Sequence, residues 1–543
     1  MDTAQITTQD IAQDAAQAVA QVLIDGKWRA ADSEGTFHAE NPAKGEALPL
    51  AFPISRWSDC DATLNAATKA AAELRTIDPA KIAAFLEAYA TNIEANAAAI
   101  VAAAAEETAL PVTPRLKDVE LPRTTNQLRQ AATAAREESW RNATLDLEKN
   151  IRSYFAPIGP VVVFGPNNFP FAFNGISGGD FAAAIAAGNP VIAKAHPLHP
   201  NTTRLLAEQA LKAVEQTGLP RATVQLIYNV SNETGLKLVS DPRVGAIGFT
   251  GSRNAGLHLK RAAEDAGKPI FLEMSSINPV LFLPNALAER PDQLAQELVD
   301  SILAGSGQFC TSPNLLLVFE TPEAKSQAEA FLAQIAKSFN DRPTQPLLSS
   351  AGRKQLAGGV TALRNAGAQL VTGGDNAPGD GYRYANTLLR TTAKQFLANP
   401  RDLQREVFGN ATLAVTVSSQ SELESILRLL EGNLTGTIYS AKSGADDNLY
   451  NATAPLLRER VGRLLNDKMP TGVAVSPAMN HGGPYPSTSH PGTTSVGIPA
   501  SIHRFAKLDC YDAVRPERLP AILKDTIQNP KTWRSINGTW VQG

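Results

Sequence analysis

The sequence predicts an α/β protein with at least two domains, and three observations lead to this fold class. Between residues 158 and 275, short apolar runs alternate with helix-like stretches at intervals of roughly 20 to 30 residues, as in parallel strands joined by crossover helices. A second region of the same kind begins at residue 279 and continues to about residue 470. The length of 543 residues also exceeds what a single hydrophobic core usually supports.

The chain begins with a polar, alanine-rich segment, residues 1–20, for which the sequence indicates no function. An Asp-Gly pair at positions 25 and 26 separates two short runs and predicts a hairpin with a type I′ turn. From about residue 58 to residue 150 the pattern is helical. Apolar residues recur at helical spacing between positions 82 and 93, and the preceding Asp78-Pro79 pair marks the start of that helix.

The first α/β region contains five expected strands and the helices that connect them. The strands cover residues 161–164, 191–194, 223–227, 244–249 and 269–272. The helices cover residues 179–187, 202–217 and 254–266. Doubly wound sheets bind nucleotides at the carboxyl ends of their strands, so we expect a nucleotide-binding domain here.

The second α/β region begins with an expected strand at 279–283, and another strand follows at 315–319. Thr321 and Pro322 then predict a helix start, because they supply a capping hydroxyl and a proline in the first turn. Residues 481–497 are rich in Gly, Pro, Ser and Thr, which is typical of a loop. Such a loop can also line the entrance to a substrate site.

Composition excludes several classes of function. The 50 Lys and Arg residues balance 53 Asp and Glu residues, so no basic excess points to nucleic acid or to an anionic membrane as a partner. The longest apolar stretch, residues 97–105, is mostly alanine and too short to cross a bilayer. Three cysteines in so long a chain fit a reducing compartment, and residues 1–10 contain acids but no arginine. We therefore expect a cytoplasmic protein.

A cysteine in a glycine-rich segment is the first candidate for chemistry. Residues 305–311 place Cys310 among small and polar residues, directly before the expected strand at 315–319. Glycines allow a ligand to approach the backbone closely, and an ionised thiol at such a place can attack a carbonyl carbon. The alternative is a buried free cysteine without a chemical role.

Two further residues supply groups that a thiol-dependent reaction needs. Asn168 follows the expected strand at 161–164, where a turn could aim its amide at a developing oxyanion; the alternative is an ordinary Asn-Pro turn. Glu273 directly follows the expected strand at 269–272. An acid at that position is either a paired structural group or a general base.

Two motifs suit a nucleotide. Gly251 and Ser252 follow a strand and open a helix, and the amino end of a helix suits a pyrophosphate. Glycine turns are common, however, and the GxGxxG fingerprint is absent. Glu406 lies two residues before the aromatic Phe408, and the alternative for this acid is an ordinary surface pair with Arg405.

Together these motifs resemble the aldehyde dehydrogenase superfamily over nearly the whole chain. The resemblance is carried, in chain order, by Asn168, Lys194, Gly251-Ser252, Glu273, Cys310 and residues 406–409. A narrower group, the 2,5-dioxovalerate (α-ketoglutaric semialdehyde) dehydrogenases and bacterial fatty aldehyde dehydrogenases, is similar at residues 194–200, 273–279, 481–486 and 532–538. The resemblance implies oxidation of an aldehyde to a carboxylic acid with a nicotinamide cofactor.

The resemblance also implies a role for each catalytic residue. Cys310 forms a thiohemiacetal with the aldehyde, and its oxyanion is held by the side chain of Asn168 and by the backbone N–H of Cys310. Loss of a hydride leaves a thioester. Glu273 then activates the water that releases the acid.

For the cofactor, the resemblance assigns roles to five residues: Lys194 for the adenosine ribose, Gly251 and Ser252 for the diphosphate, Glu406 for the nicotinamide ribose and Phe408 for the nicotinamide ring. NAD-selective members place a glutamate three residues after the lysine, where this chain has Pro197. A carboxylate there would repel a 2′-phosphate, whereas Lys194 offers it a positive donor. We therefore expect NADP as the preferred cofactor, with NAD still usable.

The resemblance divides the chain into a lead segment and three structural units. A Rossmann-type nucleotide-binding domain comprises residues 21–139 and 158–275. An α/β catalytic domain comprises residues 276–475. A small β element for oligomerisation, with the tail, comprises residues 140–157 and 476–543. Because family members oligomerise, we expect a homodimer or a higher homo-oligomer.

The expected substrate is an aldehyde with an acid at its far end, and 2,5-dioxopentanoate is the best single candidate. Arg123 and Arg129 lie in a segment similar to a helix that lines the tunnel entrance in the narrower group, and a guanidinium binds a carboxylate bidentately. The alternative for the two arginines is a solvated helix face, and the alternative substrate is a long-chain or other aliphatic aldehyde.

Asn167 and Asn410 stand where family members usually have an aromatic residue and a proline, and either change could reshape the tunnel. Ser275-Ser276 replaces a glycine pair of many members.

The sequence supports no metal site. His196, His199, His481 and His490 have no carboxylate or cysteine at ligand spacing, so they are interpreted as surface or loop histidines. Two rivals to an acid-producing dehydrogenase are a CoA-acylating aldehyde dehydrogenase, which the presence of Glu273 disfavours, and a non-catalytic descendant of the fold.

Overall fold

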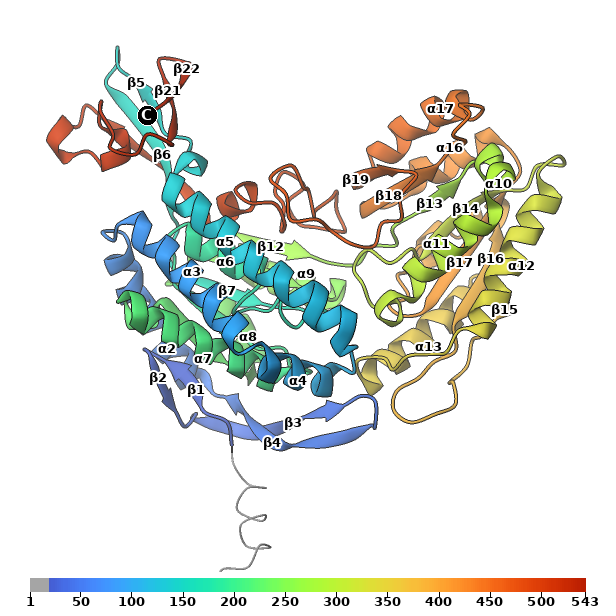
Figure 1. Cartoon of the computed structure of the whole chain (residues 1–543), viewed down its shortest axis with the longest axis horizontal. Helices are drawn as coiled ribbons and strands as arrows, with labels where there is room; N and C mark the ends of the chain where they lie inside the picture. Colours follow the sequence, from blue (N-terminus) through green and yellow to red (C-terminus); the bar gives the residue numbers. More distant parts are fainter. Residues whose placement is uncertain (1–18) are drawn as a thin grey trace, which may run out of the picture.

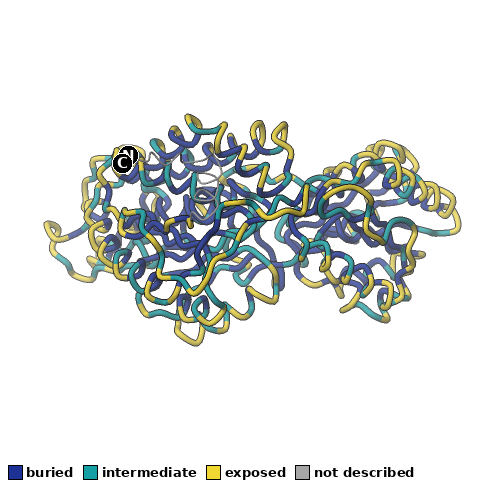
Figure 2. Tube along the Cα trace, turned by 90° about the horizontal axis from the view of Figure 1, so that it is seen from below, coloured by how far each residue is buried: buried dark blue, intermediate teal, exposed yellow. Residues whose placement is uncertain are grey.

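Two large α/β units lie side by side in the computed structural model, and a smaller β-sheet projects beside the first unit (Figure 1). The structure describes residues 19–543, so nearly all of the expected lead segment at 1–20 lies outside the described residues. Each unit has its own buried interior, which Figure 2 shows in dark blue. Within residues 19–543, no helix is both long and apolar enough to cross a membrane.

The first unit is built on a seven-stranded sheet with the crossovers of a doubly wound fold. Its order is β12 (Ile270–Glu273), β11 (Ala246–Thr250), β7 (Val161–Phe164), β8 (Val191–Lys194), β9 (Val224–Ile227), β1 (Val22–Ile24) and β2 (Lys27–Arg29). The first five strands are parallel, and the predicted β1–β2 hairpin has positive φ at both residues of its turn. Glu273 pairs with Thr250, and Lys194 with Phe164, so these strand ends share the carboxyl edge of the sheet.

Helices cover both faces of this sheet. They are α2 (Trp57–Leu74), α3 (Pro79–Ala95), α4 (Ala97–Thr108), the π-helical η1 (Val112–Glu120), α5 (Leu121–Glu137), α6 (Gly179–Ala186), α7 (Pro200–Thr217), α8 (Asn232–Ser240) and α9 (Arg253–Asp265). The apolar face predicted between residues 82 and 93 is buried in α3, which Asp78 caps by accepting a hydrogen bond from the backbone N–H of Ala80 at 2.9 Å. The prediction of helix up to residue 150 is wrong. Glu138 and Asn142 adopt left-handed backbone conformations, which end α5 before strand β5 (Thr144–Asp146).

The second unit contains another seven-stranded sheet. Its order is β15 (Gln369–Thr372), β16 (Thr387–Thr392), β17 (Ala411–Val417), β14 (Leu315–Phe319), β13 (Val280–Phe282), β18 (Asn433–Tyr439) and β19 (Val461–Asn466). Strand β15 pairs antiparallel with β16, and the other pairs are parallel. Its helices are α10 (Pro284–Glu289), α11 (Pro291–Leu303), α12 (Lys325–Asp341), α13 (Ser350–Asn365), α14 (Ala393–Ala398), α15 (Pro400–Leu403), α16 (Gln420–Leu429) and α17 (Asp447–Arg458). The helix predicted to open at Thr321 begins at Lys325 instead, because Thr321 forms a separate turn by accepting from the backbone N–H of Ala324.

Two smaller sheets complete the fold. One joins β10 (Asn229–Val230), β4 (Glu46–Ser55) and β3 (Ser33–Asn41). The other has the order β20 (Ala506–Asp512), β6 (Ile151–Pro157), β5, β21 (Trp533–Ile536) and β22 (Thr539–Gln542), so strands within residues 140–157 pair with strands of the tail. Residues 476–505 contribute no strand to this sheet. They form a separate tail segment that crosses to the carboxyl edge of the first sheet, where Met274 donates to the carbonyl of Ser487 at 2.8 Å.

The tail segment 476–505 packs against β19 through a very close backbone approach. A Cβ added at Gly462 would lie 1.8 Å from the carbonyl oxygen of Gly482. The φ of Gly462 lies outside the left-handed region, so space alone, and not backbone conformation, requires glycine at this position.

We expect Gly462→Ala to displace the tail segment. Overpacking of this kind costs about 1–3 kcal/mol, so Tm should fall and limited proteolysis should cut residues 476–505 faster. Gly358→Ala is the matched control, because an added Cβ on this residue of α13 meets nothing within 4 Å. Alanine should stabilise that helix by about 0.5–1 kcal/mol. An unchanged Tm and unchanged proteolysis in Gly462→Ala would contradict this packing.

Candidate active site

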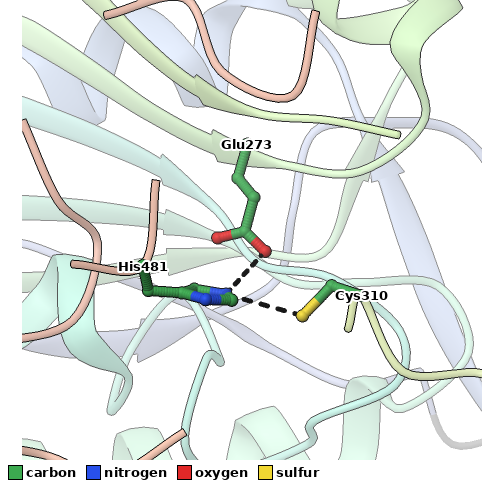
Figure 3. A group of neighbouring side chains, drawn as sticks. All are labelled: Glu273, Cys310 and His481. Atoms are coloured by element: carbon green, nitrogen blue, oxygen red, sulfur yellow. Dashed lines mark hydrogen bonds and ion pairs between the residues drawn. The ribbon is translucent and has the colours of Figure 1, made fainter. Parts of the chain in front are cut away.

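Three side chains from distant parts of the sequence meet between the two large sheets (Figure 3). Nε2 of His481 lies 3.0 Å from Oε1 of Glu273 and 3.5 Å from Sγ of Cys310. Sγ, Nε2 and a carboxylate oxygen all lie within 4.8 Å of one another. The side chains of Glu273 and His481 are only 5% and 1% exposed, whereas Cys310 is partly exposed.

A strained turn positions Cys310. Gly305, Ser306 and Gly307 form the turn η4 (Ala304–Gly307), and all three have a positive φ. A Cβ at Gly307 would lie 2.1 Å from the carbonyl oxygen of Gly409, so only glycine allows the thiol loop to approach the segment that carries Glu406.

Asn278 holds the other side of the thiol loop. Its Nδ2 donates to the carbonyls of Cys310 and Ser312, both at 2.9 Å, and its Oδ1 accepts from the hydroxyls of Ser276 at 2.8 Å and Thr435 at 2.9 Å. Ser276, which stands where many family members have glycine, therefore has a structural role, because its hydroxyl orients the amide that fixes the nucleophile loop.

The electrostatics of the cluster favour a charged Glu273 and a neutral Cys310. Burial raises the pKa of the Cys310 thiol well above its ordinary value, and the negative charge of Glu273 raises it further. Burial alone would also raise the pKa of Glu273, but the interaction with His481 and hydrogen bonds from His481 and Ser495 hold that pKa below its usual value. The nucleophile must therefore lose its proton to a neighbouring group before it can react.

Two hydrogen-bond donors lie beside the thiol. The side chain of Asn168 is buried, and its Nδ2 donates to the carbonyl of Gln308 at 2.8 Å, within the thiol loop. The backbone N–H of Cys310 makes no hydrogen bond with any of residues 19–543. This arrangement suits an oxyanion formed at a carbon bonded to Sγ.

A cavity of about 230 Å³ opens in front of Cys310 and extends along the carboxyl edge of the first sheet. Its lining includes Asn168, Gly251, Ser252, Glu273, Cys310, Glu406 and Phe408. Ser252 caps the amino end of α9, with its Oγ accepting from the backbone N–H of Ala255 at 3.4 Å. Burial raises the pKa of Glu406, and the hydroxyl of Ser275 and the backbone N–H of Ser276 counteract this shift.

These residues fit a nicotinamide dinucleotide. The amino end of α9 presents backbone N–H groups suited to a diphosphate, and Glu406 offers a half-buried acceptor for ribose hydroxyls. Lys194 ends β8, and its ammonium makes no hydrogen bond within the described part of the chain, although burial lowers its pKa to about 8. A half-buried donor without a partner in the described chain, at this edge of the sheet, is consistent with a ligand that completes its hydrogen bonding.

His481 is the site residue that the sequence interpretation missed. The interpretation of His481 as a loop histidine without a carboxylate or cysteine partner is wrong. Its partners are 208 and 171 residues away in the chain, so no local spacing could reveal them. Sγ, Nε2 and the carboxylate oxygen lie close enough together to bind one metal ion. The hydrogen bonds of Nε2 account for the cluster without an ion.

The other histidines make different contacts. Nε2 of His199 lies 2.9 Å from the carbonyl oxygen of Pro166, and Nδ1 of His490 lies 2.8 Å from Oγ of Ser489. His196 stacks on His199 with ring centroids 5.5 Å apart. Among residues 19–543, none of these three belongs to a cluster of metal-ligating side chains.

The two candidate substrate arginines differ. Arg129 donates to both carboxylate oxygens of Glu94, at 2.6 and 2.7 Å, on the half-exposed side of α5, so a carboxylate of the chain itself already binds this guanidinium. Arg123 lies inward, with its Cζ 5.2 Å from the ring centroid of Phe173, whose ring is 5.8 Å from that of His481. Its Nε and Nη2 are buried without a partner in the described chain.

The two unusual asparagines also differ. Asn167 lines the cavity, as expected for a residue that changes the tunnel. Asn410 is buried and donates to the carbonyl of Tyr384 and to Oδ1 of Asn386, both at 2.8 Å. Its amide therefore ties the loop after Glu406 to strand β16, and the expectation that it reshapes the tunnel is not supported by its contacts.

The fold and site define a nucleotide-binding α/β protein with a partly buried thiol, a buried carboxylate and a buried amide at the ligand edge. A model of the Aldehyde dehydrogenase family matches residues 28–454, and the chain belongs to this family. It is 38% identical over 524 residues to alpha-ketoglutaric semialdehyde dehydrogenase 2 of Azospirillum brasilense, covering 94% of this chain and 97% of that protein. It is 34% identical over 534 residues to alpha-ketoglutaric semialdehyde dehydrogenase of Acinetobacter baylyi, covering 96% and 98%.

Solved structures share the fold. Lactaldehyde dehydrogenase from Escherichia coli superposes with a TM-score of 0.78 at 22% identity, covering 91% of this chain and 98% of that one. A 3,6-anhydro-L-galactose dehydrogenase in complex with NAP gives a TM-score of 0.78 at 19% identity, covering 91% and 99%. The chain is therefore an NAD(P)-dependent aldehyde dehydrogenase, as its motifs predicted.

Proposed function

We propose that this dehydrogenase oxidises 2,5-dioxopentanoate to 2-oxoglutarate, with Cys310 as the nucleophile and NADP as the preferred cofactor. The observation that carries the proposal is the contact of one imidazole nitrogen with both the thiol and a buried carboxylate. The names of the two relatives from Azospirillum brasilense and Acinetobacter baylyi support the choice of substrate.

The first half-reaction begins with transfer of the thiol proton of Cys310 to the carboxylate of Glu273. A charged carboxylate only accepts hydrogen bonds, so the Nε2 of His481 carries the proton in the resting cluster. Once Glu273 is neutral, the same N–H donates to the thiolate. The N–H on Nε2 of His481 thus stabilises whichever of the two groups, Glu273 or Cys310, carries the negative charge. The thiolate then attacks the aldehyde carbon, and the oxyanion receives hydrogen bonds from Nδ2 of Asn168 and the backbone N–H of Cys310.

When bound, the nicotinamide would supply a hydride acceptor, and loss of the hydride would leave the carbon on Cys310 as a thioester. Lys194, Gly251, Ser252, Glu406 and Phe408 would hold the cofactor. Glu273 releases its proton to solvent and, again charged, takes a proton from a water molecule. That water attacks the thioester, the Sγ–carbon bond breaks, and the thiolate regains a proton as the acid departs.

Arg123 supports an anionic substrate. Burial lowers the pKa of its guanidinium, and the charges of Glu120 and Glu273, together with that of Cys310 when it is a thiolate, counteract the shift, so this cation lies within electrostatic reach of the reacting groups. An unpaired buried guanidinium is costly, and a substrate carboxylate would supply two hydrogen-bond acceptors in a fork geometry. A long-chain aldehyde would leave this cost uncompensated.

Assembly and location are parts of the same proposal. The sheet formed by β20, β6, β5, β21 and β22 exposes Leu508, Trp533 and Trp540, which suits contact with a second copy of the chain. We infer a homodimer or a higher homo-oligomer on this ground. All three cysteines are free thiols, which supports a cytoplasmic location.

Arg123→Gln should lower kcat/KM for 2,5-dioxopentanoate by about tenfold to a hundredfold, because a hydrogen bond to a charged group contributes about 1.5–3 kcal/mol. Oxidation of a neutral aldehyde of similar length should change much less. Arg129→Gln, on the same helix but paired with Glu94, is the matched control and should behave as the unmodified enzyme. The substrate proposal fails if long-chain aldehydes give the higher kcat/KM, or if Arg123→Gln affects both substrates equally.

Cofactor choice is tested by kcat/KM for NADP and NAD. Pro197 places no carboxylate near the adenosine ribose, so NADP should be preferred, and Pro197→Glu should reverse the preference. Because burial lowers the pKa of Lys194 to about 8, the ammonium loses its charge as the pH rises through that value, and NADP affinity should fall there. A preference of the unmodified enzyme for NAD by more than about tenfold, which is roughly 1.4 kcal/mol, would contradict the proposal.

A further inference from the structure

We propose that Arg115 is a positioning residue that holds the loop of Asn168 and the loop of Cys310 in one catalytic arrangement. This inference rests on the proposed roles of those two residues. Arg115 lies in η1, away from the sequence motifs that identify the family, and it does not line the cavity in front of the thiol. Its contacts, however, include residues that are adjacent in the chain to Asn168 and to Cys310.

The guanidinium of Arg115 lies against two phenyl rings and one carbonyl. Its Nη2 donates to the carbonyl oxygen of Asn168 at 3.1 Å. Its Cζ lies 4.4 Å from the ring centroid of Phe169 and 5.2 Å from that of Phe309, and the two rings are 5.1 Å apart. Phe169 directly follows Asn168, and Phe309 directly precedes the nucleophile. One planar cation thus contacts the immediate neighbours of the amide donor and of the thiol.

Glu120 fixes the guanidinium from the opposite side. Its Oε2 accepts from Nη1 of Arg115, and its side chain is fully buried. Its Oε1 accepts from the backbone N–H groups of Phe171 at 2.8 Å and Ala172 at 3.0 Å, so the same carboxylate holds the chain that follows Asn168. The position of the amide therefore depends on the Arg115–Glu120 pair through two separate sets of contacts.

The expected consequence concerns the chemical step. An oxyanion donor works only if it lies where the charge develops, and a shift of about 1 Å can cost on the order of a hundredfold in rate. Substrate affinity and cofactor affinity depend on other residues. A residue that only stabilised the fold would instead change Tm and affect all steps together.

Arg115→Lys separates these two roles. Lysine keeps the positive charge for Glu120, but it lacks the planar fork that donates to Glu120 and Asn168 while it stacks on both rings. We expect Tm and the Kd of the cofactor to stay close to those of the unmodified enzyme. The rate of acylation in a single turnover should fall by about tenfold to a hundredfold, with KM little changed. Arg129→Lys is the matched control, since its partner Glu94 lies on the outer face of the molecule.

A double-mutant cycle with Asn168→Ala tests whether Arg115 acts through the amide. Once the amide is absent, Arg115→Lys should lower the acylation rate much less than it does in the unmodified enzyme. Full additivity of the two effects, or a normal acylation rate in Arg115→Lys, would overturn the inference. Loss of the fold in both Arg115→Lys and Arg115→Gln would also overturn it, in favour of a purely structural pair. Failure of the proposed function would give a different result from failure of this inference, because the unmodified enzyme itself would then oxidise none of the tested aldehydes.

Discussion

The donor on Nε2 of His481 serves two potential anions, the carboxylate of Glu273 and the thiolate of Cys310, and the rest of the site depends on this shared contact. A buried charge without a partner is costly, so only one of the two groups can be charged while the single N–H stabilises it. In the resting cluster the charge lies on Glu273, which raises the pKa of the thiol. The nucleophile is therefore kept protonated until proton transfer within the cluster releases it.

Holding three such groups together requires unusually close packing of distant segments. Glu273 ends a strand of the first sheet, Cys310 follows a turn of three residues with positive φ, and His481 arrives on the tail segment 476–505. Glycines allow the backbone contacts that join these segments, at Gly307 against Gly409 and at Gly462 against Gly482. Polar side chains then fix the geometry, because buried amides and hydroxyls must satisfy their hydrogen bonds and do so across segment boundaries.

The sequence predicted both α/β regions, with the five parallel strands of the first sheet but only β13 and β14 of the second, because buried parallel strands and amphipathic helices leave periodic patterns. Motif resemblance also led to the prediction that Cys310 and Glu273 are site residues, and both contact His481 in the structure. It could not find His481, whose partners are distant in the chain, so only the folded tail reveals its role. Arg123 and Arg129 looked equivalent in the sequence. Six positions in a helix of 3.6 residues per turn separate two side chains by roughly 240°, so Arg123 lies beside Phe173 while Arg129 pairs with Glu94 on another face of the helix.

The most direct test of this account is intact-protein mass spectrometry of Glu273→Gln during the first turnover. The substitution removes the water-activating base, which contributes about 10²–10⁴-fold, and it also removes both the acceptor of the Cys310 thiol proton and the charge that raises the pKa of that thiol. Acylation should therefore be slower than in the unmodified enzyme, with the thiol proton lost to solvent, and hydrolysis of the thioester should be slower still. The account predicts one equivalent of reduced cofactor per active site and a protein mass increased by one acyl group, absent in Cys310→Ser. Normal steady-state turnover without an acyl adduct, or no reduced cofactor at all, would contradict it.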